Sequence, residues 1–267
     1  MRIDLPSIFG QNFSTLPHGK AAAEVIAMSN ARRNAFLVGM ALLGLLGPLA
    51  APCRADVTVY DRITTVGMPV KLVVRTTAFF MADGGRLVDI LRDEERLGRI
   101  MTGGDGYGYL QLTPQRAGLF KIAARSQGNE ASGWLLVLEK TDRVVVVEAE
   151  AVLKEIQLRP DAREICRKTF ESLRQRFQLI FVYRFLGADF SRSGLEKEGL
   201  SPSVVIPWRG AASLESLRGR GVQVHAVIGS AEMVAAAGAQ VPRRISFEKA
   251  RGAKTVSGWE ELAKALE

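Results

Sequence analysis

The spacing of apolar residues changes part-way along this chain, and that change limits the possible folds more than any other feature. Residues 56–140 contain short runs in which apolar and polar residues alternate, with turn residues between the runs. From residue 143 onward, continuous apolar runs alternate with segments of helical spacing. A period of two is typical of strands buried on one face, whereas continuous β-branched runs are typical of strands buried on both. We therefore predict two domains that meet near residues 140–142.

Residues 56–140 are predicted to form an all-β immunoglobulin-like sandwich. Six or seven short strands in a segment of this length match such a fold. The Asp-Gly-Tyr-Gly-Tyr of residues 105–109, followed by Thr-Pro-Gln-Arg-Ala-Gly-Leu-Phe at 113–120, resembles the corner before the sixth strand of bacterial Ig-like domains. This resemblance implies a fold and no particular ligand.

Residues 141–267 are predicted to form a Rossmann-like α/β domain. Apolar segments of strand length alternate with segments of helical spacing, which favours a parallel sheet with helices on both faces. Ser257 and Glu260 have the spacing of a capping box at the last helix. The expected strands are residues 143–147, 178–185, 203–207, 222–228 and 244–247, and the expected helices are residues 160–176, 195–199, 211–220, 231–239 and 257–266.

The first 55 residues have the layout of an export signal. Arg32 and Arg33 precede an uncharged apolar run, residues 35–51, and a small-x-small sequence ends at Ala55. Basic residues, an apolar run and small residues in this order are typical of a secretory signal peptide. We expect residues 1–55 to be an extension and a signal, with translation starting at Met28 and cleavage after Ala55. The mature bacterial protein would be periplasmic or secreted.

Charge and composition exclude several classes of function. The chain carries 36 Lys and Arg against 28 Asp and Glu, a net charge of +8, and cleavage after Ala55 would leave +5. The basic residues are scattered rather than clustered, so we expect no nucleic acid as a partner, whereas contact with a membrane surface stays open. Two Cys and two His this far apart exclude a zinc site of ordinary spacing. We interpret Cys166 as a buried, inert thiol and His225 as a packing residue within a strand.

Charged and polar residues stand at the carboxyl ends of the predicted parallel strands, which is where open α/β sheets bind ligands. Two interpretations of the pair after the first strand stay open: solvated loop residues, or carboxylates of a cleft that binds a cation or another ligand. The Arg after the third strand either faces an anionic ligand or merely follows a Trp that packs under a helix. The candidate site residues are Glu148, Glu150, Tyr183, Arg184, Arg209, Ser230 and Glu232.

This order of strands and polar residues resembles the haloacid dehalogenase (HAD) superfamily of phosphatases, and most closely its small, lipin-like phosphatidate-phosphatase branch. In that family the first strand ends in Asp-x-Asp, which supplies a nucleophile that also binds metal and a general acid/base. Here Glu148-Ala149-Glu150 stands in that place. Tyr183 or Arg184 stands where the family has a phosphoryl-binding Thr or Ser. Gly229-Ser230, with Glu232 nearby, replaces the family's Gly-Asp metal motif.

The resemblance implies a magnesium-dependent phosphatase, but every catalytic position differs from the family motif. Glu is one methylene longer than Asp, and a displacement of that size costs about a hundredfold in rate. Ser230 lacks the carboxylate that would help to complete a magnesium site. The nearest cation to the family's phosphate-binding Lys is Arg218 or Arg220. We therefore expect that aspartyl-phosphate chemistry has been lost.

Three functions follow from these observations, and we expect the first. It is a non-catalytic binding or scaffolding module, a pseudoenzyme without a cofactor, whose partner is an envelope protein or an anionic ligand. The alternative is a magnesium-dependent phosphomonoesterase, possible substrates being phosphatidate and other lipid phosphates. Glu148 would then be its nucleophile, Glu150 its acid/base, and Glu148 and Glu232 its Mg²⁺ ligands. The third is a structural envelope protein that uses its positive charge against anionic lipid or polymer.

Overall fold

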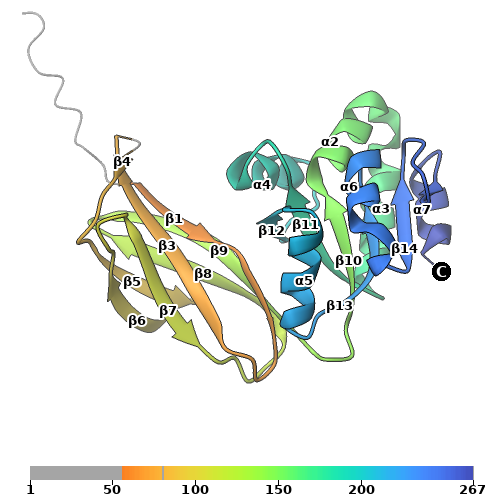
Figure 1. Cartoon of the computed structure of the whole chain (residues 1–267). Coiled ribbons are helices and arrows are strands. Elements are labelled where there is room, and N and C mark those ends of the chain that lie inside the picture. Colours follow the sequence, from red (N-terminus) through yellow and green to blue (C-terminus); the bar gives the residue numbers. More distant parts are fainter. Residues whose placement is uncertain (1–55, 80, 267) are drawn as a thin grey trace, which may run out of the picture. The chain divides into compact units, whose positions relative to one another are not determined.

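The computed structural model describes residues 56–79 and 81–266 (Figure 1). These described residues belong to one compact unit. The predicted start at Met28, the apolar run of the export signal and cleavage after Ala55 lie outside the described residues. Within the described part, no helix is both long enough and apolar enough to cross a membrane.

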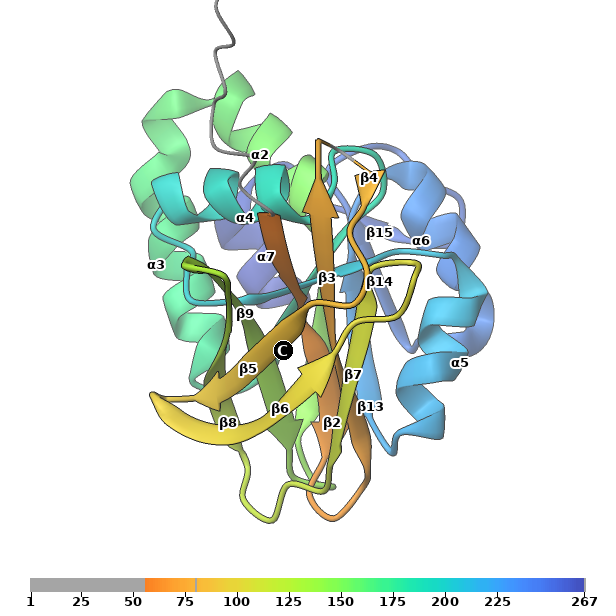
Figure 2. The same cartoon turned by 90° about the vertical axis from the view of Figure 1, so that its left-hand side faces the viewer.

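The first half of the described chain forms a sandwich of two β-sheets, whose strands can be followed in Figure 2. Alternate residues of both sheets meet in one apolar core, for example Leu72 and Val74 with Ile90 and Ile122. One sheet contains β1 (Asp56–Tyr60), β3 (Val70–Ala78) and β7 (Tyr107–Leu112) in that order, with β4 (Met81–Ala82) on the end of β3. The other has the order β2 (Arg62–Thr65), β9 (Asn129–Leu138), β8 (Gly118–Ser126), β5 (Leu87–Arg92) and β6 (Glu95–Met101).

The second half forms a six-stranded sheet in which every neighbouring pair is parallel. The strand order is β12 (Val204–Pro207), β11 (Gln178–Tyr183), β10 (Arg143–Glu148), β13 (Gln223–Ile228), β14 (Arg243–Ser246) and β15 (Lys254–Thr255). Its helices are α2 (Ala149–Leu158), α3 (Arg163–Arg174), α4 (Ala188–Lys197), α5 (Ala211–Gly219), α6 (Ala231–Ala237) and α7 (Trp259–Ala265), with 3₁₀ turns η1 (Pro160–Ala162) and η2 (Gly238–Gln240).

Two different apolar cores cover the two faces of the parallel sheet. Val145 and Val147 of β10 face a core built with α2, α3 and α7. Val144 and Val146 face the opposite way, because successive side chains of a strand alternate. The core on that second face contains residues of α5 and α6, and also Ile63 of β2 and Leu136 and Leu138 of β9. The sandwich therefore covers part of the second face of the parallel sheet.

Asp61 stands where the chain passes from β1 in one sandwich sheet to β2 in the other. Its carboxylate accepts hydrogen bonds from the backbone N–H of Trp134 in β9 at 2.8 Å and of Val205 in β12 at 2.7 Å. Arg192 of α4 donates to the same carboxylate at 2.8 Å. Burial raises the pKa of Asp61, and the charge of Arg192 lowers it by a smaller amount. One buried carboxylate thus joins the sandwich to the parallel sheet.

The fold class expected from the sequence, a HAD-like Rossmann domain behind an immunoglobulin-like sandwich, is wrong. Strands hold 41% and helices 29% of the described residues, so the chain is mostly β. One of its three sheets is parallel, and the other two are antiparallel or mixed. The apolar run of β10 requires cover on both faces, but it does not specify helices as that cover. Sandwich strands provide part of it, so helices do not form a complete second layer.

Two smaller expectations are also corrected. The helix α2 was not predicted, because it begins inside the Glu-x-Glu sequence that was compared with a catalytic motif: Glu148 ends β10 and Glu150 lies in the first turn of α2. The capping box at Ser257 is absent, since Gly258 precedes α7 and the Ser257 N–H and hydroxyl both donate to Glu261 at 2.8 Å. The predicted burial of Cys166 is confirmed.

Candidate functional site

Four of the predicted site residues meet at the carboxyl end of the parallel sheet. Glu148 is the last residue of β10, and Arg184 directly follows β11. Ser230 and Glu232 lie at the start of α6, just after β13. Because β10 lies between β11 and β13, the polar ends of three strands converge.

Arg184 lies at the centre of this group. One guanidinium nitrogen, Nη1, is 3.5 Å from Oε1 of Glu148 and donates to the hydroxyl of Ser230 at 3.0 Å. The other, Nη2, forms an ion pair with Glu232. The hydrogen bond to Glu232 raises the pKa of Arg184, although partial burial acts in the opposite direction. The charged guanidinium therefore pairs with two carboxylates, one at the end of β10 and one just after β13.

Glu148 is a buried carboxylate with partners on both oxygens. It is only 2% exposed, and its Oε2 accepts a hydrogen bond from the backbone N–H of Ser230. This contact requires a glycine before Ser230, because a Cβ on Gly229 would lie 2.7 Å from Oε2 of Glu148 and 2.8 Å from Sδ of Met233. The interpretation of Glu148 as a solvated loop residue is wrong, since α2 begins at the next residue and keeps the strand end in the core.

Glu150 holds the loop that follows β11. Its Oε1 accepts hydrogen bonds from the backbone N–H groups of Arg184 at 2.8 Å, Phe185 at 3.0 Å and Leu186 at 3.3 Å. Its Oε2 is buried, with no hydrogen-bond partner in the described part of the chain. A general acid or base must present an oxygen to its substrate. In this arrangement Glu150 instead positions the backbone that carries Arg184.

The residues of this group do not fit a magnesium ion. Protein sites for Mg²⁺ combine one or two carboxylates with open positions for water and phosphate oxygens. Here the guanidinium of Arg184 already pairs with Glu148 and Glu232, and its charge would repel a second cation at the same place. Among residues 56–79 and 81–266, no three His, Cys, Asp or Glu side chains gather as a metal site.

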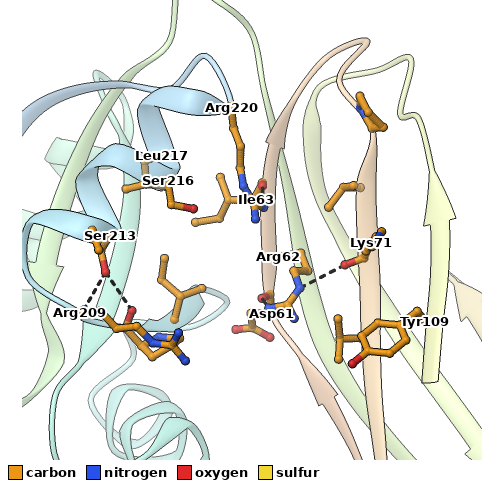
Figure 3. A pocket seen from close by; sticks show the side chains of 16 residues that line it. Asp61, Arg62, Ile63, Lys71, Tyr109, Arg209, Ser213, Ser216, Leu217 and Arg220 are labelled. Atoms are coloured by element: carbon orange, nitrogen blue, oxygen red, sulfur yellow. Dashed lines mark hydrogen bonds between the residues drawn. The ribbon is translucent and has the colours of Figure 1, made fainter. Parts of the chain in front are cut away.

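Tyr183 and Arg209 lie apart from the group around Arg184. Tyr183 lines a cavity of about 200 Å³ together with Asp189 and Pro207, and burial raises its pKa. Arg209 lines a groove of about 640 Å³ between α5 and the sandwich (Figure 3). The prediction grouped them because all follow the ends of neighbouring strands. Successive side chains of a strand point in opposite directions, so one edge of a sheet serves more than one surface.

The groove also contains basic residues that sequence reasoning missed. Arg62 and Lys71 come from the sandwich and appeared in the sequence as scattered charges. Arg220, which follows α5, was named only as the cation nearest to the position of the HAD family's phosphate-binding Lys. The ends of the parallel strands pointed to Arg209 and gave no reason to place the other three basic residues beside it.

Comparison with known proteins gives no family for this chain. No family model matches it, and no curated protein matches it. Domains 4 and 5 of the S-layer protein SbsC are 12% identical over 31% of this chain and 51% of that one, with a TM-score of 0.25. The fibronectin(III)-like modules of Clostridium thermocellum CbhA are 15% identical over 32% of this chain and 48% of that one, with a TM-score of 0.24.

A carbohydrate acetylesterase from Xanthomonas citri is 12% identical over 72% of this chain and 59% of that one, with a TM-score of 0.31. In the S-layer and fibronectin-like structures named above, this chain matches about half of the length of each. Similarities this weak carry no argument about function, and they give no support to the HAD resemblance.

Proposed function

We propose that this chain is a non-catalytic binding or scaffolding module that acts in the periplasm or outside the cell. The carboxylates at the carboxyl end of the parallel sheet pair with Arg184 or accept hydrogen bonds from backbone N–H groups. Those contacts stabilise the strand ends and leave neither Glu148 nor Glu150 in a position to attack a substrate. The compact packing of the sandwich against the parallel sheet supplies a rigid surface instead.

The observation that carries this proposal is the position of Arg184. A nucleophilic carboxylate needs an accessible oxygen that can approach a substrate to about 3–3.5 Å. Oε1 of Glu148 faces Arg184, and Oε2 accepts from the Ser230 N–H. A phosphate would have to displace both partners before it could reach Glu148.

The test is a hydrolysis assay with a generic phosphomonoester and with phosphatidate, each with and without Mg²⁺. We expect no turnover above that of the Glu148→Ala variant. The exposed variant Glu232→Gln is the second comparison, because it keeps Glu148 in place if Glu148→Ala does not fold. Magnesium-dependent turnover that is lost in either variant would overturn the proposal in favour of a phosphomonoesterase.

Export is a separate part of the proposal with its own test. The signal-like layout of residues 35–55 supports it. Mass spectrometry of the chain recovered from outside the cytoplasm should give a mature protein that begins at Asp56. A chain that stays in the cytoplasm with its first residues intact would contradict export.

A further inference from the structure

The groove between α5 and the sandwich has the size of a small-molecule site. Its volume of about 640 Å³ falls within the usual range of ligand pockets. One wall is formed by α5 and the end of β12, and the other by β2, β3 and β7 (Figure 3). Arg209 and Arg220 belong to the first wall, and Arg62, Lys71 and Tyr109 to the second.

Positive charge in this groove is not balanced by its own walls. Among the described residues, Asp61 is the one carboxylate in the lining, and Arg192 and two backbone N–H groups already occupy it. Arg62 donates to the carbonyls of Lys71 and Asp61, and Arg220 donates to that of Ile63 at 2.7 Å. Burial lowers the pKa of Arg62, and repulsion from Arg220 lowers it further. An anion between these guanidinium groups would relieve that repulsion.

The positive charges are spread along the groove rather than gathered at one point. Arg209 lies just before α5 and Arg220 just after it. Nine helical residues span about 14 Å, so the two side chains start from opposite ends of the wall. A single phosphate would reach one end only. A ligand that uses both ends carries two or more separate anionic groups.

Apolar and hydroxyl-bearing side chains lie between the charges of the groove. Ile206 is partly exposed and Tyr109 is 56% exposed, whereas Ile63 and Leu217 lie behind the groove in the buried core. The strand β3 is paired on both sides, with β1 and with β7, whereas β2, β7 and β12 each pair with one neighbour among the described strands. On β2, the carbonyl of Ile63 already accepts a hydrogen bond from Arg220. The basic side chains are the recognition groups that the groove presents along its length. A ligand with flat apolar faces between its anionic groups would suit these walls. The ring of Tyr109 offers it apolar surface, and the tyrosine hydroxyl offers a polar tip.

We propose that this groove binds an acidic oligosaccharide, a short sugar chain that carries carboxylate or sulfate groups. Guanidinium groups bind the planar carboxylate or the sulfate oxygens through paired N–H donors. The apolar face of a sugar ring packs against Tyr109, and the anionic groups reach Arg209 at one end and Arg220 at the other. The inference rests on the proposed binding function and names the ligand class of that function.

Calorimetric titration of the full chain tests the proposal with four probes. Three are sugars: trigalacturonate, a sulfated trisaccharide as the second anionic form, and uncharged maltotriose. The fourth, inorganic tripolyphosphate, is an oligoanion without sugar rings. The test variant is Lys71→Gln with Arg209→Gln, since both side chains are exposed and line the groove. Its matched control is Lys249→Gln with Arg251→Gln, which removes the same charges from exposed positions outside the groove.

We expect one or both acidic trisaccharides to bind and maltotriose not to bind. Affinity should fall about tenfold or more in the groove variant, since charge-assisted hydrogen bonds are lost, and should stay within about twofold in the control. Tyr109→Ala should lower the affinity for the acidic sugar but not the affinity for tripolyphosphate. Tighter binding of trigalacturonate would indicate a carboxylate ligand, and tighter binding of the sulfated trisaccharide would indicate a sulfate ligand.

Three outcomes would overturn the proposal. They are no binding of either acidic sugar, equal weakening in the groove variant and its control, and tripolyphosphate binding as tightly as the sugars. None of these bears on catalysis, which the hydrolysis assay decides separately. Failure here would remove the ligand class and leave the proposed non-catalytic function standing.

Discussion

Arg192 donates to the carboxylate of Asp61 at 2.8 Å, and this pair links a helix of the parallel-sheet part to the chain crossing of the sandwich. Asp61 also accepts from the backbone of β9 and of β12. The same carboxylate therefore satisfies donors from three elements that are distant in the sequence. Its loss would leave those donors without a partner in a place that water does not reach.

Asp61→Asn should lower the free energy of unfolding by about 3–5 kcal/mol, the usual cost of breaking a buried pair from one side. An amide keeps the shape but offers one acceptor oxygen where the carboxylate offers two. Asp189→Asn is the matched control, since Asp189 also pairs with Arg192, at 3.5 Å, but is 85% exposed. The control should change stability by less than about 1 kcal/mol. Urea unfolding measures both, and equal effects would contradict the role given to Asp61.

Gly133→Ala should destabilise the protein by about 1–3 kcal/mol, as overpacking does in tight sites. A Cβ at this position would lie 2.8 Å from Oδ1 of Asp61 and 2.9 Å from the carbonyl oxygen of Val59. The control is Gly219→Ala, where a Cβ meets nothing within 4 Å. Thermal unfolding of the two variants makes the comparison. A normal midpoint for Gly133→Ala would show that β1 and β9 can separate at this point without cost.

Much of the local structure follows from the sequence, because apolar period and turn residues determine local structure directly. The run of Val144 to Val147 predicts a strand buried on both faces, and β10 is one. What covers those faces depends on distant contacts such as that of Ile63, which precedes Val144 by 81 residues (144 − 63), and no local pattern contains such a contact. The same limit explains the incorrect fold class.

Arg184→Met should lower the free energy of unfolding by about 3 kcal/mol, because it leaves the buried carboxylate of Glu148 without its cation. Glu232→Gln removes the other partner of Arg184, yet Glu232 has a 76% exposed side chain and should matter little. Chemical denaturation distinguishes the two. If Glu232→Gln were the more damaging change, the central role of the Arg184–Glu148 contact would be refuted.

His225 should make the protein less stable as the pH falls from about 7.5 to 5.5. Burial and the charges of Arg243 and Arg143 lower the pKa of His225 in the folded chain. The unfolded chain then binds a proton near pH 6.5 that the folded chain does not yet bind, so acid favours unfolding. In His225→Gln the fall in stability across this range should be smaller. An identical pH dependence in the variant would show that other groups dominate.

Cys166 should resist thiol reagents in the folded protein at pH 8. Burial raises its pKa to about 12, so the thiolate that reacts is scarce as well as inaccessible. A disulfide reagent such as dithionitrobenzoate, used on a Cys53→Ser background, should react only after denaturant is added. Rapid reaction of the native chain would mean that α3 opens readily.

The candidate site could be foreseen in position but not in chemistry. The ends of β10, β11 and β13 identify Glu148, Arg184 and Ser230 as neighbours, since parallel strands end at one edge. Arg184 points toward the carboxylates rather than outward to a ligand, and this depends on the hydrogen bonds that Glu150 accepts from the backbone N–H groups of Arg184 and Phe185. The groove residues Arg62 and Arg220 come together only through tertiary packing.

The sandwich strands that cover one face of the parallel sheet make the two parts inseparable in a practical sense. A cut between Leu138 and Arg143 would leave each half with a bare apolar surface, formed on one side by Ile63 and Leu136 and on the other by Ile180 and Val204. Bare surfaces of this kind cause aggregation. Neither half is therefore a portable module that recombination could join to a new partner, and the two must be inherited together.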